Sequence, residues 1–198
     1  MHPLKGIALK ICSVITFITM ASLIKATAQH VPAGQAVFFR SVFALPVILA
    51  WLAVRGDLRT GLKAASPMGH FWRGFVGTAA MGLGFAGLGL LPLPEVTAIG
   101  YAAPLMTVIL AAMFLGEQVR LFRLGAVALG MVGVLIVLGP RLSAFSGDTV
   151  EKTAALGAML VLTGALCAAL AQIYIRKLVQ SEQTSAIVFY FSVTSASL

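Results

Sequence analysis

The sequence predicts an all-α membrane protein: a polytopic helical bundle with six complete spans and a truncated seventh. The first observation is composition, since 60% of the residues are hydrophobic, 10% are charged and the mean hydropathy is +1.00. So few polar residues cannot cover the surface of a soluble globule of 198 residues. The second is that uncharged stretches recur whose length, roughly 17 to 23 residues, is what a helix needs to cross a bilayer. The third is an uneven distribution of positive charge between these stretches.

The apolar stretches are separated by short turns, as expected for helical hairpins in series. They cover residues 4–26, 35–54, 71–91, 96–115, 122–139 and 153–175. A seventh begins near Thr184 and has run for only about fifteen residues when the sequence ends at Leu198, which is too short to span without tilt. The longer polar connection at 141–152 predicts a boundary between two units, residues 1–151 and 152–198.

Basic residues gather on one side of the predicted spans, and Lys and Arg are retained on the cytoplasmic side of membrane proteins. One side holds ten of them: Lys5, Lys10, Arg55, Arg59, Lys63, Arg73, Arg120, Arg123, Arg176 and Lys177. The other side holds three, namely Lys25, Arg141 and Lys152. The sequence therefore predicts a cytoplasmic N-terminus. The net charge of +8 is explained by topology, and a nucleic-acid partner is not expected because no basic face with interleaved aromatic residues occurs.

The first stretch has a competing interpretation as a signal peptide. Lys5 and Lys10 precede an apolar run that ends in the small residues Ala26 and Ala28, which imitates a cleavage site. Lys25 fits that interpretation badly because it lies between the apolar run and the imitated site. An internal repeat also gives this stretch a structural role.

A shift of 151 residues aligns the first two stretches with the sixth and seventh. It places Lys25 on Arg176 and aligns the segment 37–42 (VFFRSV) with 188–193 (VFYFSV). The identities are few, and two unrelated amphipathic hairpins could look alike, but the helix ends and the following loop stay in register. If five helices form one unit, the second copy lies upside down in the membrane, which is the inverted repeat of many secondary transporters.

The sequence contains no residue pattern typical of a catalytic site or a metal site. His2, His30 and His70 form no ligand cluster, and Cys12 and Cys167 both lie within apolar stretches. There is no nucleotide-binding loop, nucleophile triad or carboxylate pair. We therefore expect no metal, no cofactor and no enzymatic activity in this chain.

The few polar residues inside the spans are the candidates for a substrate cavity. Arg40 lies about five residues into the second stretch, where it either extends to the interface or faces a wet interior. Lys25 lies nearer a boundary, as an interfacial anchor or at a cavity mouth. Thr97, Tyr101 and Gln172 need polar partners in a dry bundle, and helix–helix hydrogen bonds would satisfy them as well as a ligand would.

Proline and acidic residues complete this set. Pro104 frees the carbonyl of Gly100, and either a substrate or an ordinary kink with a neighbouring hydroxyl could satisfy that group. No Asp or Glu lies near the middle of a complete span, so the sequence offers no proton-coupling carboxylate. Glu117, in a turn, is expected to pair with Arg120 or Arg123.

These residues together resemble the drug/metabolite transporter superfamily, specifically the EamA-type permeases. The resemblance lies in the segments 23–26 (LIKA) and 38–40 (FFR), in 98–116 with Tyr101 and Pro104, in the ending 114–117 (FLGE), and in 125–139. It implies ten helices in two inverted five-helix repeats, both termini in the cytoplasm, a central cavity and alternating access for small metabolites. Members run to about 300 residues, so the resemblance also implies that this chain is truncated near its C-terminus.

The sequence therefore predicts a secondary transporter of a small organic metabolite, such as an amino acid, a nucleoside-like compound or a vitamin, in a bacterial inner membrane. A membrane-embedded enzyme or a noncatalytic bundle subunit is the alternative. The expected partners are the metabolite, the lipid bilayer, and either a second copy of the chain or the missing C-terminal half. Substrate identity, direction and coupling ion cannot be read from residues this apolar.

Overall fold

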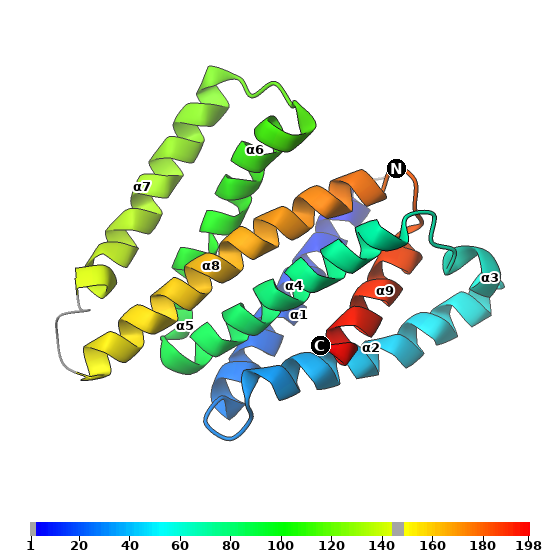
Figure 1. Ribbon diagram of the computed structural model, residues 1–198, viewed down its shortest axis with the longest axis horizontal. Coiled ribbons are helices and arrows are strands. Elements are labelled where there is room, and N and C mark those ends of the chain that lie inside the picture. Colours follow the sequence, from blue (N-terminus) through cyan, green and yellow to red (C-terminus); the bar gives the residue numbers. More distant parts are fainter. Residues whose placement is uncertain (1–2, 144–148) are drawn as a thin grey trace.

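A computed structural model describes residues 3–143 and 149–198, and within these ranges the regular structure is entirely helical (Figure 1). The helices are α1 (Pro3–Thr27), α2 (Ala33–Arg55), α3 (Leu58–Gly61), α4 (Pro67–Leu90), α5 (Leu93–Gly100), α6 (Ala102–Leu115), α7 (Leu121–Ser143), α8 (Thr149–Leu178) and α9 (Thr184–Ser197). Every predicted apolar stretch is helical, which confirms the all-α fold class. Residues 144–148 of the predicted polar connection lie outside the described ranges.

Five segments among the described residues are long and apolar enough to cross a membrane. They are Leu4–Thr27, Ala33–Arg55, Leu93–Leu115, Leu121–Arg141 and Glu151–Leu178. The chain is therefore a multi-pass membrane protein by length and composition. Helix α4, the predicted third span, is not among the five because its many glycines and Arg73 lower its hydropathy.

The predicted fourth span is one segment with an interruption at Tyr101, between α5 and α6. Pro104 has no N–H to donate to the carbonyl of Gly100, and the chain turns at this point. The N–H of Tyr101 donates to the carbonyls of Thr97 and Ala98. Pro46, in contrast, lies within a continuous α2.

The centre of the molecule is the antiparallel pair α4 and α8, which lie side by side in Figure 1. Small residues permit this close approach, as they do between membrane helices generally. A Cβ on Gly87 would lie 2.2 Å from Cγ2 of Val161, and a Cβ on Gly164 would lie 3.2 Å from the carbonyl oxygen of Ala80. Glycine thus sets the distance between the two central helices.

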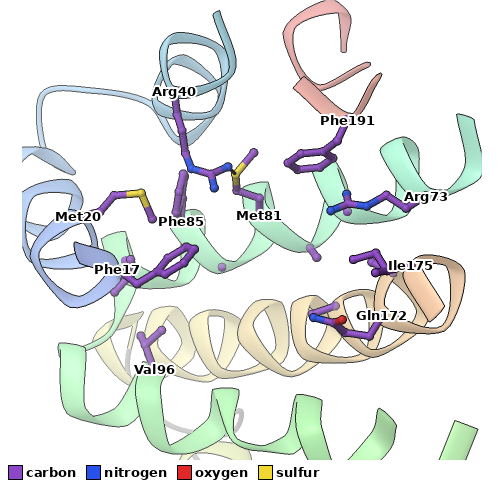
Figure 2. Close-up of a pocket in the computed structure, with 16 residues that line it drawn as sticks. Phe17, Met20, Arg40, Arg73, Met81, Phe85, Val96, Gln172, Ile175 and Phe191 are labelled. Atoms are coloured by element: carbon purple, nitrogen blue, oxygen red, sulfur yellow. Dashed lines mark hydrogen bonds between the residues drawn. The ribbon is translucent and has the colours of Figure 1, made fainter. Parts of the chain in front are cut away.

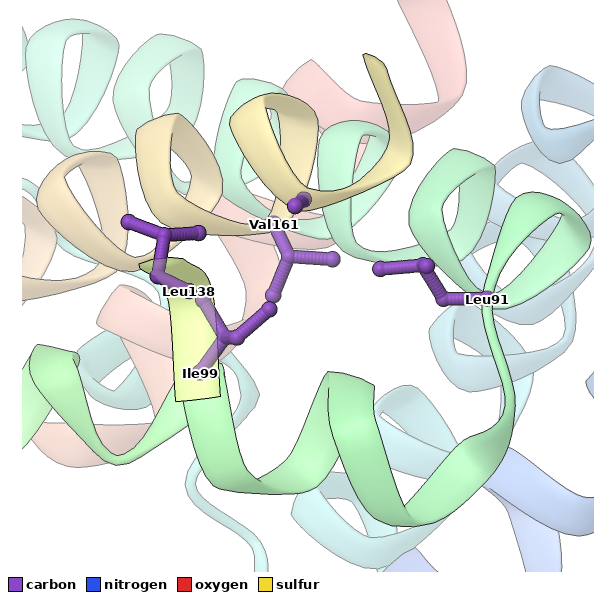
Figure 3. Packing of buried hydrophobic residues seen from close by; sticks show 5 residues of the cluster. Leu91, Ile99, Leu138 and Val161 are labelled. Atoms are coloured by element: carbon purple, nitrogen blue, oxygen red, sulfur yellow. The ribbon is translucent and has the colours of Figure 1, made fainter. Parts of the chain in front are cut away.

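Around this pair, α9 packs against α2 and α4, and α6 packs against α8 (Figure 1). The helices α1, α2, α4, α5, α8 and α9 contribute to a cavity shown in Figure 2. The other end of α8 closes over a buried apolar cluster, where Leu91, Ile99, Leu138 and Val161 meet (Figure 3). This cluster joins α5, α7 and α8 and fixes one end of the central pair.

The helices at the edges expose apolar side chains. None of the most apolar window of α1 is buried, and Leu121, Phe122 and Leu129 of α7 are largely exposed. In water such surfaces would be costly, whereas lipid tails solvate them. The outer faces therefore suit a bilayer, in agreement with the five candidate spans.

Candidate functional site

The main candidate site is a cavity of about 420 Å³, which we call the arginine cavity. Its lining residues come from six helices, drawn from the first, middle and last parts of the described chain (Figure 2). Two arginines, three phenylalanines and two methionines dominate the lining, which comprises Phe17, Met20, Arg40, Arg73, Gly77, Ala80, Met81, Gly84, Phe85, Leu88, Val96, Ala168, Ala171, Gln172, Ile175 and Phe191. The arginine cavity is thus mostly apolar, with a few polar groups, as ligand sites commonly are.

Arg40 extends from α2 toward Met81 of α4 (Figure 2). Its Nη1 lies 2.6 Å from the sulfur of Met81, which is a weak acceptor. The side chain is partly buried, and no acidic residue is among the described residues that line the cavity. Arg40 therefore brings a positive charge into the cavity that its recorded contact does not neutralise.

Arg73 of α4 extends into the same space. Its guanidinium carbon lies 3.9 Å from the centre of the Phe191 ring of α9, a cation–π contact. Its Nε and Nη1 atoms are buried, and neither has a hydrogen-bond partner among the described residues. Such buried donors are costly, and native structures rarely leave them unmet unless another molecule satisfies them.

Gly77 provides the space that the Arg73 guanidinium occupies. A Cβ at this position would lie 2.4 Å from Nη1 of Arg73 and 2.9 Å from Cε2 of Phe191. Gly77 lies one helical turn after Arg73 on α4, so the guanidinium lies over the glycine's bare backbone. A side chain here would displace the guanidinium, the phenyl ring or both.

Among the residues selected from the sequence, the structure places Arg40 and Gln172 in the arginine cavity. Pro104 lines an adjoining pocket between α6 and α8 that shares Ala168 and Gln172 with it. The hydroxyl of Thr97 donates to the carbonyl of Leu93 on its own helix.

Tyr101 and Lys25 are placed away from the arginine cavity. Tyr101 is 64% exposed at the break between α5 and α6. The Lys25 ammonium donates to the carbonyl oxygen of Leu91 at 2.9 Å, where the last carbonyls of α4 favour a cation. Neither residue is part of the arginine cavity lining.

Arg73 is the main residue that sequence reasoning missed. The sequence predicts that it lies on the basic cytoplasmic side because the predicted third stretch begins at Phe71, whereas α4 begins four residues earlier at Pro67. Arg73 therefore lies in the second turn of the helix rather than at its start. Gly77, four residues later, is a sequence signal for this position of Arg73. A glycine one helical turn away leaves room for a long cationic side chain to lie along its own helix.

A second buried polar region, which we call the Glu182 cluster, joins the loop before α4 to the loop between α8 and α9. One carboxylate oxygen of Glu182 accepts hydrogen bonds from the backbone N–H groups of Ala65 and Ser66, each at 2.7 Å. The same oxygen lies 3.3 Å from Nε2 of His70, and the two side chains are 1% and 3% exposed. The ring of His70 packs against that of Tyr190, with centroids 4.8 Å apart.

The surroundings of Glu182 favour its ionised form. Burial alone would raise the pKa of this carboxyl, but the hydrogen bonds from Ser66 and Ala65 and the interaction with His70 outweigh it and lower the pKa. Two further contacts join α9 to the end of α3 and to the residue that follows it. Ser185 donates to the carbonyl of Gly61 at 2.8 Å, and Tyr190 donates to that of Leu62 at 3.1 Å.

Two ion pairs lie nearer the surface. Glu95 at the start of α5 accepts two hydrogen bonds from Arg141 of α7, at 2.5 and 3.0 Å. Glu117 pairs with Arg176 of α8 at 2.6 Å, so the expectation that it pairs with Arg120 or Arg123 is wrong. The fold brings the end of α8 beside the turn after α6, a proximity that local sequence spacing could not indicate.

Within residues 3–143 and 149–198, no group of three His, Cys, Asp or Glu side chains could hold a metal ion. His2, one of the three histidines considered from the sequence, lies outside these residues.

Comparison with known proteins identifies relatives of one kind. The model of the EamA-like transporter family matches residues 4–139. A pseudopaline exporter of Pseudomonas aeruginosa is 28% identical over 94% of this chain and 62% of its own length. An S-adenosylmethionine uptake transporter of Rickettsia prowazekii is 25% identical over 98% of this chain and 62% of its own length.

This chain thus spans about 62% of the length of these curated relatives, which are named as transporters rather than as enzymes. An uncharacterized transporter of Helicobacter pylori is 23% identical over 94% of this chain and 60% of its own length. No solved structure matches the chain.

Proposed function

This chain belongs to the EamA-like transporter family, and on that premise we propose that the protein is a secondary transporter that moves a small organic metabolite across a membrane by alternating access. The observation that carries the proposal is the arginine cavity, which lies among helices from both ends of the chain. A site between two structural repeats is where such transporters bind their substrates.

The cavity lining supports the internal repeat. Positions 151 residues apart face the same space, namely Phe17 with Ala168, Met20 with Ala171, and Arg40 with Phe191. The first member of each pair comes from α1 or α2, and the second comes from α8 or α9. A pseudo-twofold arrangement of the two hairpins around the cavity accounts for this correspondence.

The helix ends support the same repeat. Helix α1 ends at Thr27 and α8 at Leu178, whereas α2 begins at Ala33 and α9 at Thr184, so both pairs of ends are 151 residues apart. We therefore propose that residues 1–151 form the first five-helix repeat and that 152–198 begin the second, inverted one. In this account α4 is a span, and the complete transporter has ten.

The proposed orientation places the N-terminus in the cytoplasm of a bacterial inner membrane. The sequence assigns ten basic residues to that side and three to the other, and nine remain on that side when Arg73, which lines the arginine cavity, is left out. The Glu182 cluster then lies on the cytoplasmic side. Its hydrogen bonds hold the loop before α4 to the loop after α8.

The remaining spans would come from the C-terminal part of a longer polypeptide or from a second copy of this chain. An amino acid, a nucleoside-like compound or a vitamin is the proposed kind of substrate. The two named relatives are an exporter and an uptake transporter, so family membership does not choose the direction of transport.

Transport by the full-length protein tests the proposal. Cells that lack candidate uptake systems would express the wild type, and the accumulation or loss of labelled metabolites would be measured. Arg40→Ala should abolish the transport of any compound moved by the wild type without lowering the amount of protein in the membrane. Arg55→Ala is the matched control, because Arg55 lies on the same helix but outside the arginine cavity. Normal transport by Arg40→Ala would contradict the proposed role of the cavity.

A further inference from the structure

We propose that the arginine cavity binds an organic anion, whose charged group lies between Arg40 and Arg73 and whose apolar part lies against the phenylalanines. This inference rests on the proposed transport function and names its class of substrate. It depends on the charge balance, on the contacts of the two arginines and on the composition of the rest of the lining.

The charge balance of the cavity is one-sided. Both arginines line it, and no Asp or Glu is among the described lining residues. The two guanidinium groups enter the same space from α2 and α4 (Figure 2). Like charges in a region of low dielectric constant are unfavourable, and an anion placed between them would relieve both the repulsion and the loss of hydration.

The recorded contacts of the arginines leave donors available. Arg73 stacks on Phe191, which holds the guanidinium in place without using its N–H groups. Its Nε and Nη1 are buried without partners among the described residues. Arg40 contacts only the weak acceptor Met81 among the hydrogen bonds recorded for it. The planar guanidinium presents paired donors that match the two oxygens of a carboxylate.

Local structure keeps Arg73 available to the cavity. Gly77 leaves the room in which the guanidinium lies. The other carboxylates recorded in ion pairs have their own partners: Glu95 pairs with Arg141, Glu117 with Arg176 and Glu182 with His70. The remaining described acidic residues, Asp57 and Glu151, are exposed and do not line the cavity, so the two cavity arginines are left to an external anion.

The rest of the lining defines the other half of the ligand. Phe17, Phe85 and Val96 form an apolar wall, and Gln172 contributes one neutral amide (Figure 2). Aromatic surfaces of this kind favour a ring or a branched apolar group. The inferred substrate is thus an organic anion with one apolar portion, rather than an inorganic ion or a cation.

Binding to the purified full-length protein tests the inference. The probe is 3-phenylpropanoate, and the control ligand is its neutral amide, which has nearly the same shape. A series of larger aryl carboxylates, each compared with its own amide, extends the test to ligands larger than 3-phenylpropanoate. Binding would be followed by the rise in melting temperature with ligand concentration. We expect the carboxylates to bind roughly tenfold or more tightly than their amides, because charge-assisted hydrogen bonds are the strong ones.

Variants identify the groups responsible. Arg40→Met and Arg73→Met should each remove the preference for the carboxylate, whereas Arg73→Lys should keep part of it because the charge remains. Arg55→Met is the control for the loss of one arginine outside the cavity. A carboxylate preference that survives in both Met variants would overturn the inference, and so would a wild type that binds no carboxylate or binds amide and acid equally. Equal binding of the amide and the acid is the result expected if a carboxylate elsewhere in the full-length protein pairs with these arginines.

Flux in proteoliposomes separates this inference from the proposed function. Selective binding of the carboxylate without flux of any probe would contradict transport but leave the anion site standing. Flux of the amide as fast as that of the acid would contradict the anion site but leave transport standing.

Discussion

The arginine cavity and the Glu182 cluster are both buried and charged, but they differ in how their charged groups are satisfied. Glu182 accepts two backbone hydrogen bonds and lies beside His70, whose two ring nitrogens are themselves buried without hydrogen-bond partners among the described residues. Arg73 has two buried nitrogens without partners, and Arg40 has a weak sulfur contact. Buried polar groups that stabilise a fold normally find their hydrogen-bond partners within the protein, whereas those in a binding site find them in the bound ligand. The difference suggests that the Glu182 cluster stabilises the fold and that the arginine cavity serves recognition.

Removing the Glu182 carboxylate should produce the largest effect on stability. Glu182→Ala leaves the N–H groups of Ala65 and Ser66 without their acceptor, at a cost of roughly 3 kcal/mol. The melting temperature of the detergent-solubilised protein measures this loss. Glu182→Gln is the matched control because its amide oxygen can still accept both hydrogen bonds. Equal stability of the Ala variant and the wild type would show that the cluster is not structural.

Filling the space at Gly77 should affect binding more than folding. Gly77→Ala pushes on the guanidinium of Arg73 and the ring of Phe191, so we expect transport to fall roughly tenfold, which corresponds to about 1.4 kcal/mol. Gly82→Ala is the control, because a Cβ there meets nothing within 4 Å on the same helix. Initial rates of transport and the amount of protein in the membrane should be measured for both. Equal rates in the two variants would indicate that the position of Arg73 is unimportant.

The stability contributed by Glu182 should depend on pH. Its pKa is lowered in the folded protein, so its charge stabilises the fold above the pKa of the unfolded chain, about 4.3, and this contribution is lost as the pH falls through the folded pKa. The difference in melting temperature between the wild type and Glu182→Gln should therefore shrink between about pH 6 and pH 3. A difference that stays constant over this range would show that the charge of Glu182 contributes nothing.

The surface pair of Glu117 and Arg176 should matter least. Both side chains are about 40% exposed, so Glu117→Gln should cost less than about 1 kcal/mol, and less still at high salt. Melting temperatures at low and high ionic strength give the comparison. A loss as large as that of Glu182→Ala would mean that burial is not what distinguishes the two carboxylates.

Much of the fold could be predicted from the sequence, because an apolar stretch long enough to span a bilayer has few other stable conformations. The predicted stretches correspond to helices whose ends differ from the predictions by a few residues. The errors have physical causes. An apolar run does not show where a helix with a polar first turn begins, as with α4. The effect of a proline also differs between spans: the segment with Pro104 is interrupted at Tyr101, whereas the helix with Pro46 is continuous.

The candidate site was predicted less well. Arg40 and Gln172 could be selected because polar residues are rare within apolar stretches, and both line the cavity. Thr97 and Lys25 satisfy the same criterion but hydrogen-bond to backbone carbonyls. A rare polar residue indicates a need for a partner, and the sequence does not say whether that partner is the protein or a ligand.

The sequence by itself determined that this protein is a bundle of membrane helices. Hydropathy, span length and charge asymmetry are properties of each segment, and they act on its insertion into a bilayer without any tertiary contact. Tertiary structure alone decided which polar side chains meet: Arg73 joins Arg40 in the cavity, Glu117 joins Arg176, and Glu182 joins His70. These associations depend on the packing of α4 against α8 and α9 and of α6 against α8, which are contacts between residues far apart in the chain.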